Sequence, residues 1–157
     1  MASISKLNPN SEQVLDDLVR CETRLYNALS EALRAEYGLT FAQFEFMRYL
    51  QRSPGSRVAD LATCFAVGVG ATSKGIDRLE QVGFVQRIAN PNDRRSSLLQ
   101  LTTKGQKEVL RSRKVVDRHL FQLIESSIGI PAFQSLADVL HLLRVSLEKD
   151  GIGTPAG

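Results

Sequence analysis

The stretch covering residues 67–101 constrains the fold of this chain more than any other part of the sequence. A helical pattern runs over residues 69–82, and Gly83 ends it. Two runs rich in β-favouring residues follow, at 84–89 and 97–102, and the polar loop between them contains Asn, Pro and two arginines. Short runs of this kind on both sides of turn-forming residues predict a β-hairpin.

Helical patterns precede this stretch. Apolar residues step by three and four over residues 11–37, Thr40 and Gln43 have the spacing of a capping box, and Ser56 can cap a short helix. That short helix, a turn and the helix over 69–82 make a helix-turn-helix, in which the second helix enters the major groove of DNA.

Two more helices are predicted after the hairpin, over residues 103–128 and 129–149. The first helix of the chain, about 40 Å long at 1.5 Å per residue, is long for so small a protein, so part of its apolar seam needs a partner chain. The predicted fold is mainly α with a small β wing: one domain, residues 1–157, with a winged helix-turn-helix and further helices at both ends.

Basic residues are concentrated in the middle of the chain. Between Arg48 and Arg118 there are 14 Lys and Arg against 6 Asp and Glu, whereas the two flanks together are net acidic. This asymmetry fits a nucleic-acid-binding centre, because phosphate neutralisation supplies most non-specific affinity, although many basic segments are simply solvated.

Composition also limits the class of protein. Cys21 and Cys64 are too few for a disulfide framework or a four-ligand zinc site, and the sequence has no signal-peptide or membrane-span pattern. We therefore expect a cytoplasmic protein with reduced thiols, no membrane association, and no metal or other cofactor.

The run DRLEQVGFVQRIANPNDRRSSLLQLTTKG, residues 77–105, resembles the signature of the MarR family of bacterial winged-helix regulators. The similarity in element order extends over residues 11–149. It implies a homodimer that binds a pseudo-palindromic operator in double-stranded DNA, most often as a repressor. Residues 11–37 and 129–149 would be dimerisation helices, 40–102 the winged helix-turn-helix, and 103–128 a connecting helix.

The resemblance also implies which residues contact DNA. In the recognition helix these are Gly70, Ala71, Thr72, Ser73, Lys74 and Arg78. In the wing, Asp93 orients Arg95, which enters the minor groove, while Arg94 meets a phosphate. The alternative for all these charged side chains is a solvated face.

Three glycines depart from the family pattern: Gly68, Gly70 and Gly75. Each glycine inside a helix costs about 0.5–1 kcal/mol relative to alanine, so the recognition helix is expected to be soft until DNA orders it. On this hypothesis Gly75→Ala tightens DNA binding, and a marked loss of binding indicates close packing at Gly75 instead.

The signal that controls binding is less evident from the sequence. Related proteins respond to small phenolic or other lipophilic ligands, or to oxidants. Candidate pocket residues are Arg24, Tyr26, Phe44, Met47 and Tyr49, although aromatic residues at helical spacing are more often core. Cys21 is the candidate for redox sensing. Arg20 and Arg24 could lower its pKa, but its place on the apolar seam favours plain packing.

The sequence also bears on two other functional classes, an enzyme and a DNA-architectural protein. His119 and His141 have no catalytic or metal-binding spacing around them, so no catalytic residue is expected and an enzyme is disfavoured. A DNA-architectural protein remains an alternative. It would differ from a regulator in lacking a strong preference for one palindrome over bulk DNA.

Overall fold

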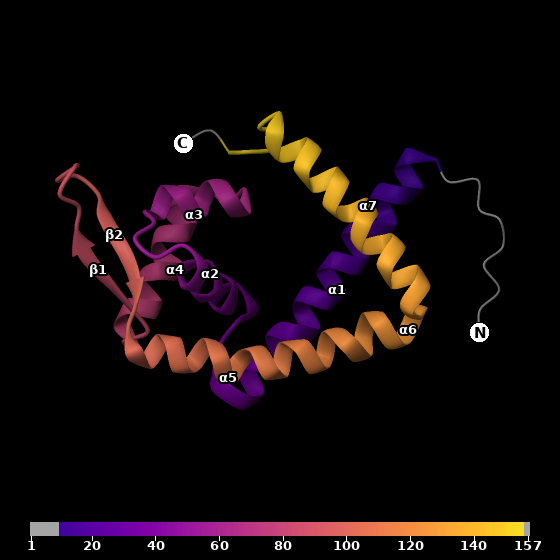
Figure 1. Cartoon of the computed structure of the whole chain (residues 1–157), viewed down its shortest axis with the longest axis horizontal. Helices are drawn as coiled ribbons and strands as arrows, with labels where there is room; N and C mark the ends of the chain where they lie inside the picture. Colours follow the sequence, from indigo (N-terminus) through magenta and orange to yellow (C-terminus); the bar gives the residue numbers. More distant parts are fainter. Residues whose placement is uncertain (1–9, 156–157) are drawn as a thin grey trace.

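The structure is a computed structural model that describes residues 10–155, and it confirms the predicted fold class (Figure 1). The elements in chain order are α1 (Ser11–Tyr37), α2 (Phe41–Arg52), α3 (Val58–Phe65), α4 (Val69–Gln81), β1 (Val85–Ala89), β2 (Ser97–Leu101), α5 (Thr103–Leu120), the π-helical turn η1 (Phe121–Glu125), α6 (Ser126–Ile128) and α7 (Ile130–Lys149).

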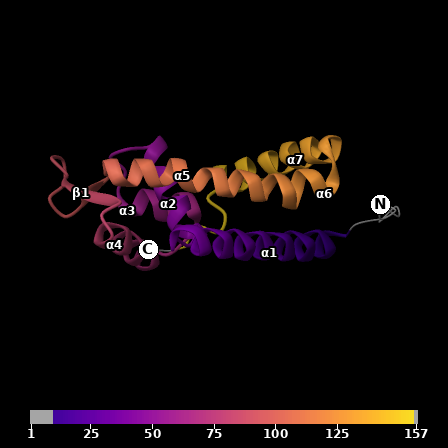
Figure 2. The ribbon, with the colours of Figure 1, turned by 90° about the horizontal axis from the view of Figure 1, so that it is seen from below.

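The molecule has a compact lobe and a long helical extension. The lobe contains α2, α3, α4 and the β1–β2 hairpin, and α5 leads from it to α6 and α7 (Figure 1). Although α7 crosses α1 in the first view, Figure 2 shows the two helices at separate levels, with α7 on the side of α5. The extension therefore has helical faces that this chain does not cover.

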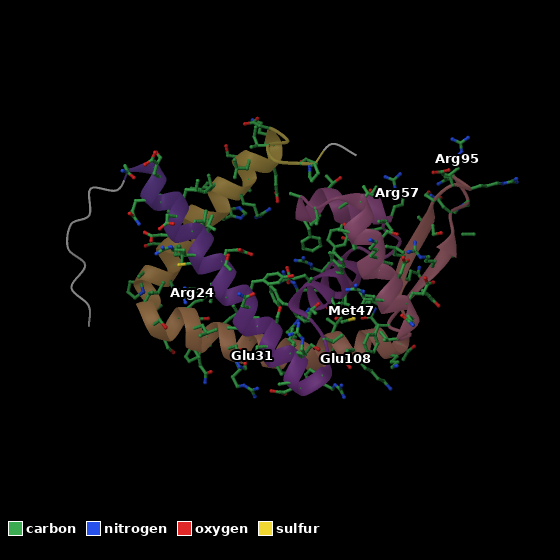
Figure 3. All side chains as sticks on the ribbon, turned by 180° about the vertical axis from the view of Figure 1, so that it is seen from behind. Arg24, Glu31, Met47, Arg57, Arg95 and Glu108 are labelled. Atoms are coloured by element: carbon green, nitrogen blue, oxygen red, sulfur yellow. The ribbon has the colours of Figure 1, made fainter. Side chains whose placement is uncertain are left out.

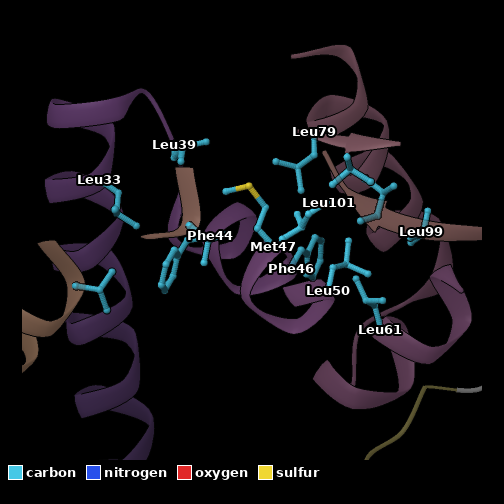
Figure 4. Close-up of a cluster of buried hydrophobic side chains, with 14 of the residues drawn as sticks. Leu33, Leu39, Phe44, Phe46, Met47, Leu50, Leu61, Leu79, Leu99 and Leu101 are labelled. Carbon is cyan, nitrogen blue, oxygen red and sulfur yellow. The ribbon is translucent and has the colours of Figure 1, made fainter. Parts of the chain in front are cut away.

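The hydrophobic core lies where α2 meets its neighbours (Figure 4). The α2 residues Phe44, Met47 and Leu50 are almost completely buried. They belong to one cluster with buried residues from every other element of the lobe and from α1 and α5: Leu29, Leu33, Leu61, Ile76, Leu79, Val85, Leu99, Val109 and Val116. Apolar burial on this scale is the main stabilising term of the lobe.

The local signals around α2 act as predicted. Gly38 follows α1 with a φ of +68°, a conformation that favours glycine, and its backbone N–H donates to the Arg34 carbonyl at 3.0 Å. At the start of α2 the backbone N–H of Gln43 donates to Thr40 Oγ1 at 3.2 Å. The Thr40 N–H donates in return to Gln43 Oε1 at 2.9 Å, which completes the capping box.

The predicted cap of α3 is wrong. Arg57, not Ser56, is the residue before the helix, and its backbone N–H donates to Asp60 Oδ2 at 2.7 Å. Ser56 instead pairs with the wing, because its carbonyl accepts the Leu99 N–H at 2.8 Å. The carbonyl of Leu99 accepts the Gly55 N–H at 2.9 Å, so the turn before α3 holds the outer edge of β2.

The two strands form the predicted antiparallel hairpin. Val85 pairs with Leu101, Arg87 with Leu99, and Ala89 with Ser97. Val85 and Leu99 are buried, so one face of the base of the hairpin joins the core while its tip extends outward.

Thr102 joins the base of the wing to α5. Its hydroxyl accepts the Gly105 N–H at 3.0 Å as an N-cap and donates to the Gly83 carbonyl at 2.7 Å. The first turn of α5 approaches the chain so closely that a Cβ on Gly105 would lie 2.0 Å from the Phe84 carbonyl oxygen. The helix predicted over 103–128 is interrupted by η1, which the sequence pattern did not indicate.

Within the described part of the chain, no helix combines the length and the apolar content needed to cross a membrane.

Candidate nucleic-acid interface

The recognition helix, α4, has one buried face and one exposed face. Ile76 and Leu79 are completely buried against the core. On the other side, Gly70, Ala71, Lys74 and Arg78 are exposed, and Ser73 is half-buried between the two faces. The structure thus brings five of the six predicted α4 residues to a surface that DNA can reach.

The prediction for Thr72 is wrong. Its side chain is 0% exposed, and its hydroxyl donates to the Gly68 carbonyl at 3.1 Å. Thr72 lies four residues before Ile76 and seven before Leu79, so the helical repeat places all three on the same inner face. Thr72 therefore stabilises the first turn of α4 and does not contact DNA.

Gly75 is a packing position. A Cβ added there would lie 2.6 Å from Cε2 and 3.2 Å from Cδ2 of Phe46, a buried residue of α2. The same addition at Gly68 or Gly70 meets nothing within 4 Å. Gly75 therefore lets α4 approach α2 closely, which favours packing over helix softness as the reason for this glycine.

The wing loop is shaped by Asp93. Its Oδ1 accepts the backbone N–H of Arg95 at 2.9 Å, and its Oδ2 accepts the Ser96 hydroxyl at 2.9 Å. These two hydrogen bonds hold the pKa of the Asp93 carboxyl below its ordinary value, and the bond from the Arg95 N–H has the larger effect. Asp93 thus positions Arg95 through its backbone and not through its guanidinium.

Arg94 and Arg95 are exposed, and neither has an ion pair with another described residue. In Figure 3 Arg95 is at the tip of the wing, and Arg57, from the start of α3, lies toward the same edge of the molecule. The Arg57 guanidinium donates to Asp60 at 2.9 and 3.2 Å, which raises the pKa of Arg57 and lowers that of Asp60. Arg57 adds a cation near the wing that the sequence analysis did not identify.

Arg87 of β1 is the second residue that the sequence analysis missed. Its Nη2 lies 2.6 Å from Asp77 Oδ1 and its Nε 3.1 Å from Glu80 Oε2, both on α4. A signal was present in the sequence: Arg87 lies two residues after Val85, which places both side chains on the same face of the strand. Asp77 and Glu80 are three residues apart and share a face of the helix.

Of the five predicted ligand residues, Tyr26 lines an open hollow. Tyr26 lies with residues of α1 and the start of α2 around an open depression, lined by Asn27, Ser30, Glu31, Arg34, Thr40 and Ala42. Burial, followed by the nearby charges of Glu22 and Glu45, raises the pKa of Tyr26.

The other four ligand candidates lie elsewhere. Phe44 and Met47 are wrong as ligand contacts, because they are 1% and 0% exposed inside the core. Tyr49 packs against Phe65 with ring centroids 5.9 Å apart, and Arg24 is exposed on α1. Phe44 and Met47 are thus core residues, and Tyr49 is half-buried and packs against the core.

The two cysteines lie on different helices, Cys21 on α1 and Cys64 on α3. Cys21 is exposed on α1, and the neighbouring Arg20 pairs with Asp16 at 3.3 Å. Cys64 is exposed on α3, and desolvation, followed by the charge of Glu148, raises the pKa of its thiol. No group of His, Cys, Asp and Glu within residues 10–155 has the arrangement of a metal site.

Comparison with known proteins places this geometry among transcriptional regulators. A family model described as "MarR family" matches residues 37–96. The chain is similar to the HTH-type transcriptional regulator BilQ of Clostridioides difficile, with 31% identity over 108 residues that cover 69% of this chain and 72% of BilQ. The HTH-type transcriptional repressor MdtR of Bacillus subtilis is 29% identical over 126 residues, covering 76% and 81% of the two chains.

A solved structure has the same arrangement in the presence of DNA. It is a cysteine-to-serine variant of MarR from Escherichia coli complexed with operator DNA. The TM-score is 0.72 at 27% identity, and the alignment covers 85% of this chain and 94% of that one.

Proposed function

The chain belongs to the MarR family of DNA-binding winged-helix transcriptional regulators, and we propose that it is a homodimeric repressor. In this proposal the dimer binds a pseudo-palindromic operator, and a small ligand releases the protein from that DNA. The observation that carries the proposal is the shared surface of α4 and the wing. The outer face of α4 carries small residues, and the wing carries two exposed arginines, Arg94 and Arg95, that have no ion pair with another described residue. Arg57 lies toward the same edge of the molecule as Arg95 (Figure 3).

In this proposal α4 lies in the major groove. Gly70 and Ala71 are small enough to let the helix backbone come close to the bases, and Lys74 donates to a guanine edge or to a phosphate. Ser73 offers a hydroxyl at the margin of the same face, and Arg78 reaches the phosphate backbone. The exposure of these side chains supports the assignment.

The wing is proposed to probe the minor groove beside each half-site. A narrow A·T-rich groove concentrates negative potential and attracts an arginine, which gives recognition of shape in place of a base code. The Asp93 hydrogen bond to the Arg95 backbone supports this role, and the exposure of Arg94 supports a contact between Arg94 and a phosphate.

Dimerisation is supported by apolar side chains that the single chain leaves in water. On α1, Leu15 is 61% exposed, and on α7, Val139 and Leu142 are 61% and 69% exposed. Contiguous exposed apolar faces of this kind mark protein interfaces. We propose residues 11–37 and 129–149 as the dimerisation helices, residues 40–102 as the winged helix-turn-helix, and 103–128 as the connection, so that a twofold axis presents two copies of α4 to one duplex.

Ligand control is proposed at the hollow beside Tyr26. The hollow lies between α1, which belongs to the dimerisation part, and the start of α2, which belongs to the DNA-binding lobe. A small lipophilic or phenolic molecule bound there would favour one relative position of the two parts and so change the spacing of the two α4 helices. Repression is supported by the name of the similar MdtR, a transcriptional repressor.

Other functions have less support. The positions of Cys21 and Cys64 do not favour redox control. No catalytic activity is proposed, because the similar proteins are transcriptional regulators. Nδ1 of His119 and Nδ1 of His141 each lie beside a residue of their own helix.

Selection of a binding site from random duplexes tests the proposal. We expect one palindrome with half-sites about one helical turn apart, bound by two protomers in sedimentation and at least about 1,000-fold more tightly than random DNA at a stated salt concentration. Binding of all duplexes with equal affinity would identify an architectural protein and contradict the proposed regulation.

A further inference from the structure

One guanidinium of the wing is held by two carboxylates of the recognition helix. Arg87 reaches from β1 to Asp77, at 2.6 Å, and to Glu80, at 3.1 Å, and its side chain is only 26% exposed. The planar guanidinium donates from Nη2 to one carboxylate and from Nε to the other, which fixes its orientation as well as its distance. We call these three residues the Arg87 clamp.

The clamp lies at the level where the wing leaves the body of the protein. Arg87 pairs with Leu99 across the hairpin, and the other edge of Leu99 is bonded to Gly55 and Ser56. Beyond this level both Ile88 and Ala89 are exposed. The hydrogen bonds of the loop that follows run among its own residues.

Arg95 is at the end of a lever that begins at the clamp. It is four residues from Leu99 along the chain, a separation of at most about 13 Å at 3.3 Å per residue, because residues 94–95 form a turn. A rotation of about 10° at the level of Arg87 would therefore move Arg95 by up to about 2 Å, more than the range over which a hydrogen bond keeps its geometry. A small rotation at the clamp therefore becomes a larger displacement of Arg95 at the minor groove.

We propose that the Arg87 clamp is a positioning device that couples the minor-groove contact of Arg95 to the major-groove contacts of α4. With the clamp intact, the wing and α4 move as one body, so docking of α4 also places Arg95. Without it, the tip of the wing samples several positions and the two contacts become independent. This inference rests on the proposed contact of Arg95 with DNA.

A double-mutant cycle on the full-length protein tests the coupling. The affinity for the selected palindrome is measured by fluorescence anisotropy for the wild type, Arg95→Ala, Arg87→Met and the double variant. Methionine keeps the apolar stem of Arg87 and removes its charge. We expect Arg95→Ala to weaken binding at least about tenfold in the wild type but less than about threefold beside Arg87→Met, because coupled sites are not additive.

The effect of Arg95→Ala is also measured in two further variants, one as a control and one as a second way to open the clamp. Arg118→Ala removes an exposed ion pair to Glu36, which lies 2.9 Å away in α1, and should leave the effect of Arg95→Ala unchanged. If Arg87→Met does not fold, Asp77→Asn combined with Glu80→Gln opens the clamp from the helix side and should reduce the coupling equally.

The outcomes separate this inference from the function on which it rests. A lower melting temperature of Arg87→Met with an unchanged loss from Arg95→Ala would mean that the clamp only stabilises the fold, and would overturn the inference alone. An Arg95→Ala variant with wild-type affinity would overturn the proposed wing contact, and the positioning role with it.

Discussion

Replacing Gly75 with alanine should destabilise the protein, although the same change usually stabilises a helix. The added methyl group would lie 2.6 Å from Cε2 of Phe46, whereas ordinary van der Waals contact begins at 3.4 Å. The ring edge must therefore retreat by nearly 1 Å. Phe46 is only 8% exposed and its ring lies 5.5 Å from that of Phe65, so the ring has little room.

The magnitude follows from two opposing terms. Overpacking a core typically costs about 1–3 kcal/mol, and alanine gains about 0.5–1 kcal/mol over glycine in a helix. The free energy of unfolding should therefore fall, by up to about 2.5 kcal/mol. Each kcal/mol lowers the melting temperature of a chain of this size by about 2–4 °C.

The assay is urea unfolding followed by circular dichroism, with a thermal melt at the same protein concentration, because a dimer's stability depends on concentration. Gly70→Ala is the matched control: it lies in the same helix and its new methyl group meets nothing within 4 Å, so it should stabilise. If Gly75→Ala stabilised the protein as much as Gly70→Ala does, the close contact between α4 and Phe46 would be refuted.

Three further predictions concern neighbouring parts of the interface. Gly105→Ala should prevent stable folding or cost several kcal/mol, because its Cβ would lie 2.0 Å from the backbone oxygen of Phe84, which cannot rotate away; a thermal melt within 2 °C of wild type, roughly 0.5–1 kcal/mol, would contradict this. Thr72→Val should cost about 0.5–1.5 kcal/mol through the lost hydrogen bond to Gly68 yet leave the selected DNA sequence unchanged, since the side chain is buried; an altered sequence preference would restore Thr72 as a base contact. The pKa of the Asp93 carboxyl, measured by NMR titration, should lie below the ordinary pKa of Asp. The contribution of this carboxylate to wing order is then complete above the ordinary pKa and is lost only as the pH falls through the lowered pKa. A titration midpoint at or above the ordinary pKa would exclude the two hydrogen bonds.

The sequence predicted the parts of the fold that depend on local signals. The left-handed turn at Gly38, the capping box of Thr40 and Gln43, and the turn residues between the two strands each act within a few residues, so the elements they delimit appear where they were expected. The inward face of α4 was also predictable, because Thr72 lies one helical turn before Ile76 and shares its buried face.

Contacts between distant segments were not predictable in the same way. The approach of Gly75 to Phe46 joins residues of two helices whose crossing the sequence does not specify, so the glycine was attributed to softness instead of packing. Phe44 and Met47 have the aromatic or sulfur-containing side chains of a ligand pocket, but their complete burial depends on how α2 is enclosed by its neighbours. Arg87 requires both the hairpin register and its packing on α4.

Hydroxyl-radical footprinting of the selected palindrome tests the central claim most directly. If α4 occupies the major groove and Arg95 the minor groove, each half-site should show a protected minor-groove patch on its outer side, in a symmetric pattern phased by about one helical turn. In Arg95→Ala these outer patches should disappear while the protection at the two half-sites persists. Outer protection that survives in Arg95→Ala, or unphased protection along the whole duplex, would contradict the account.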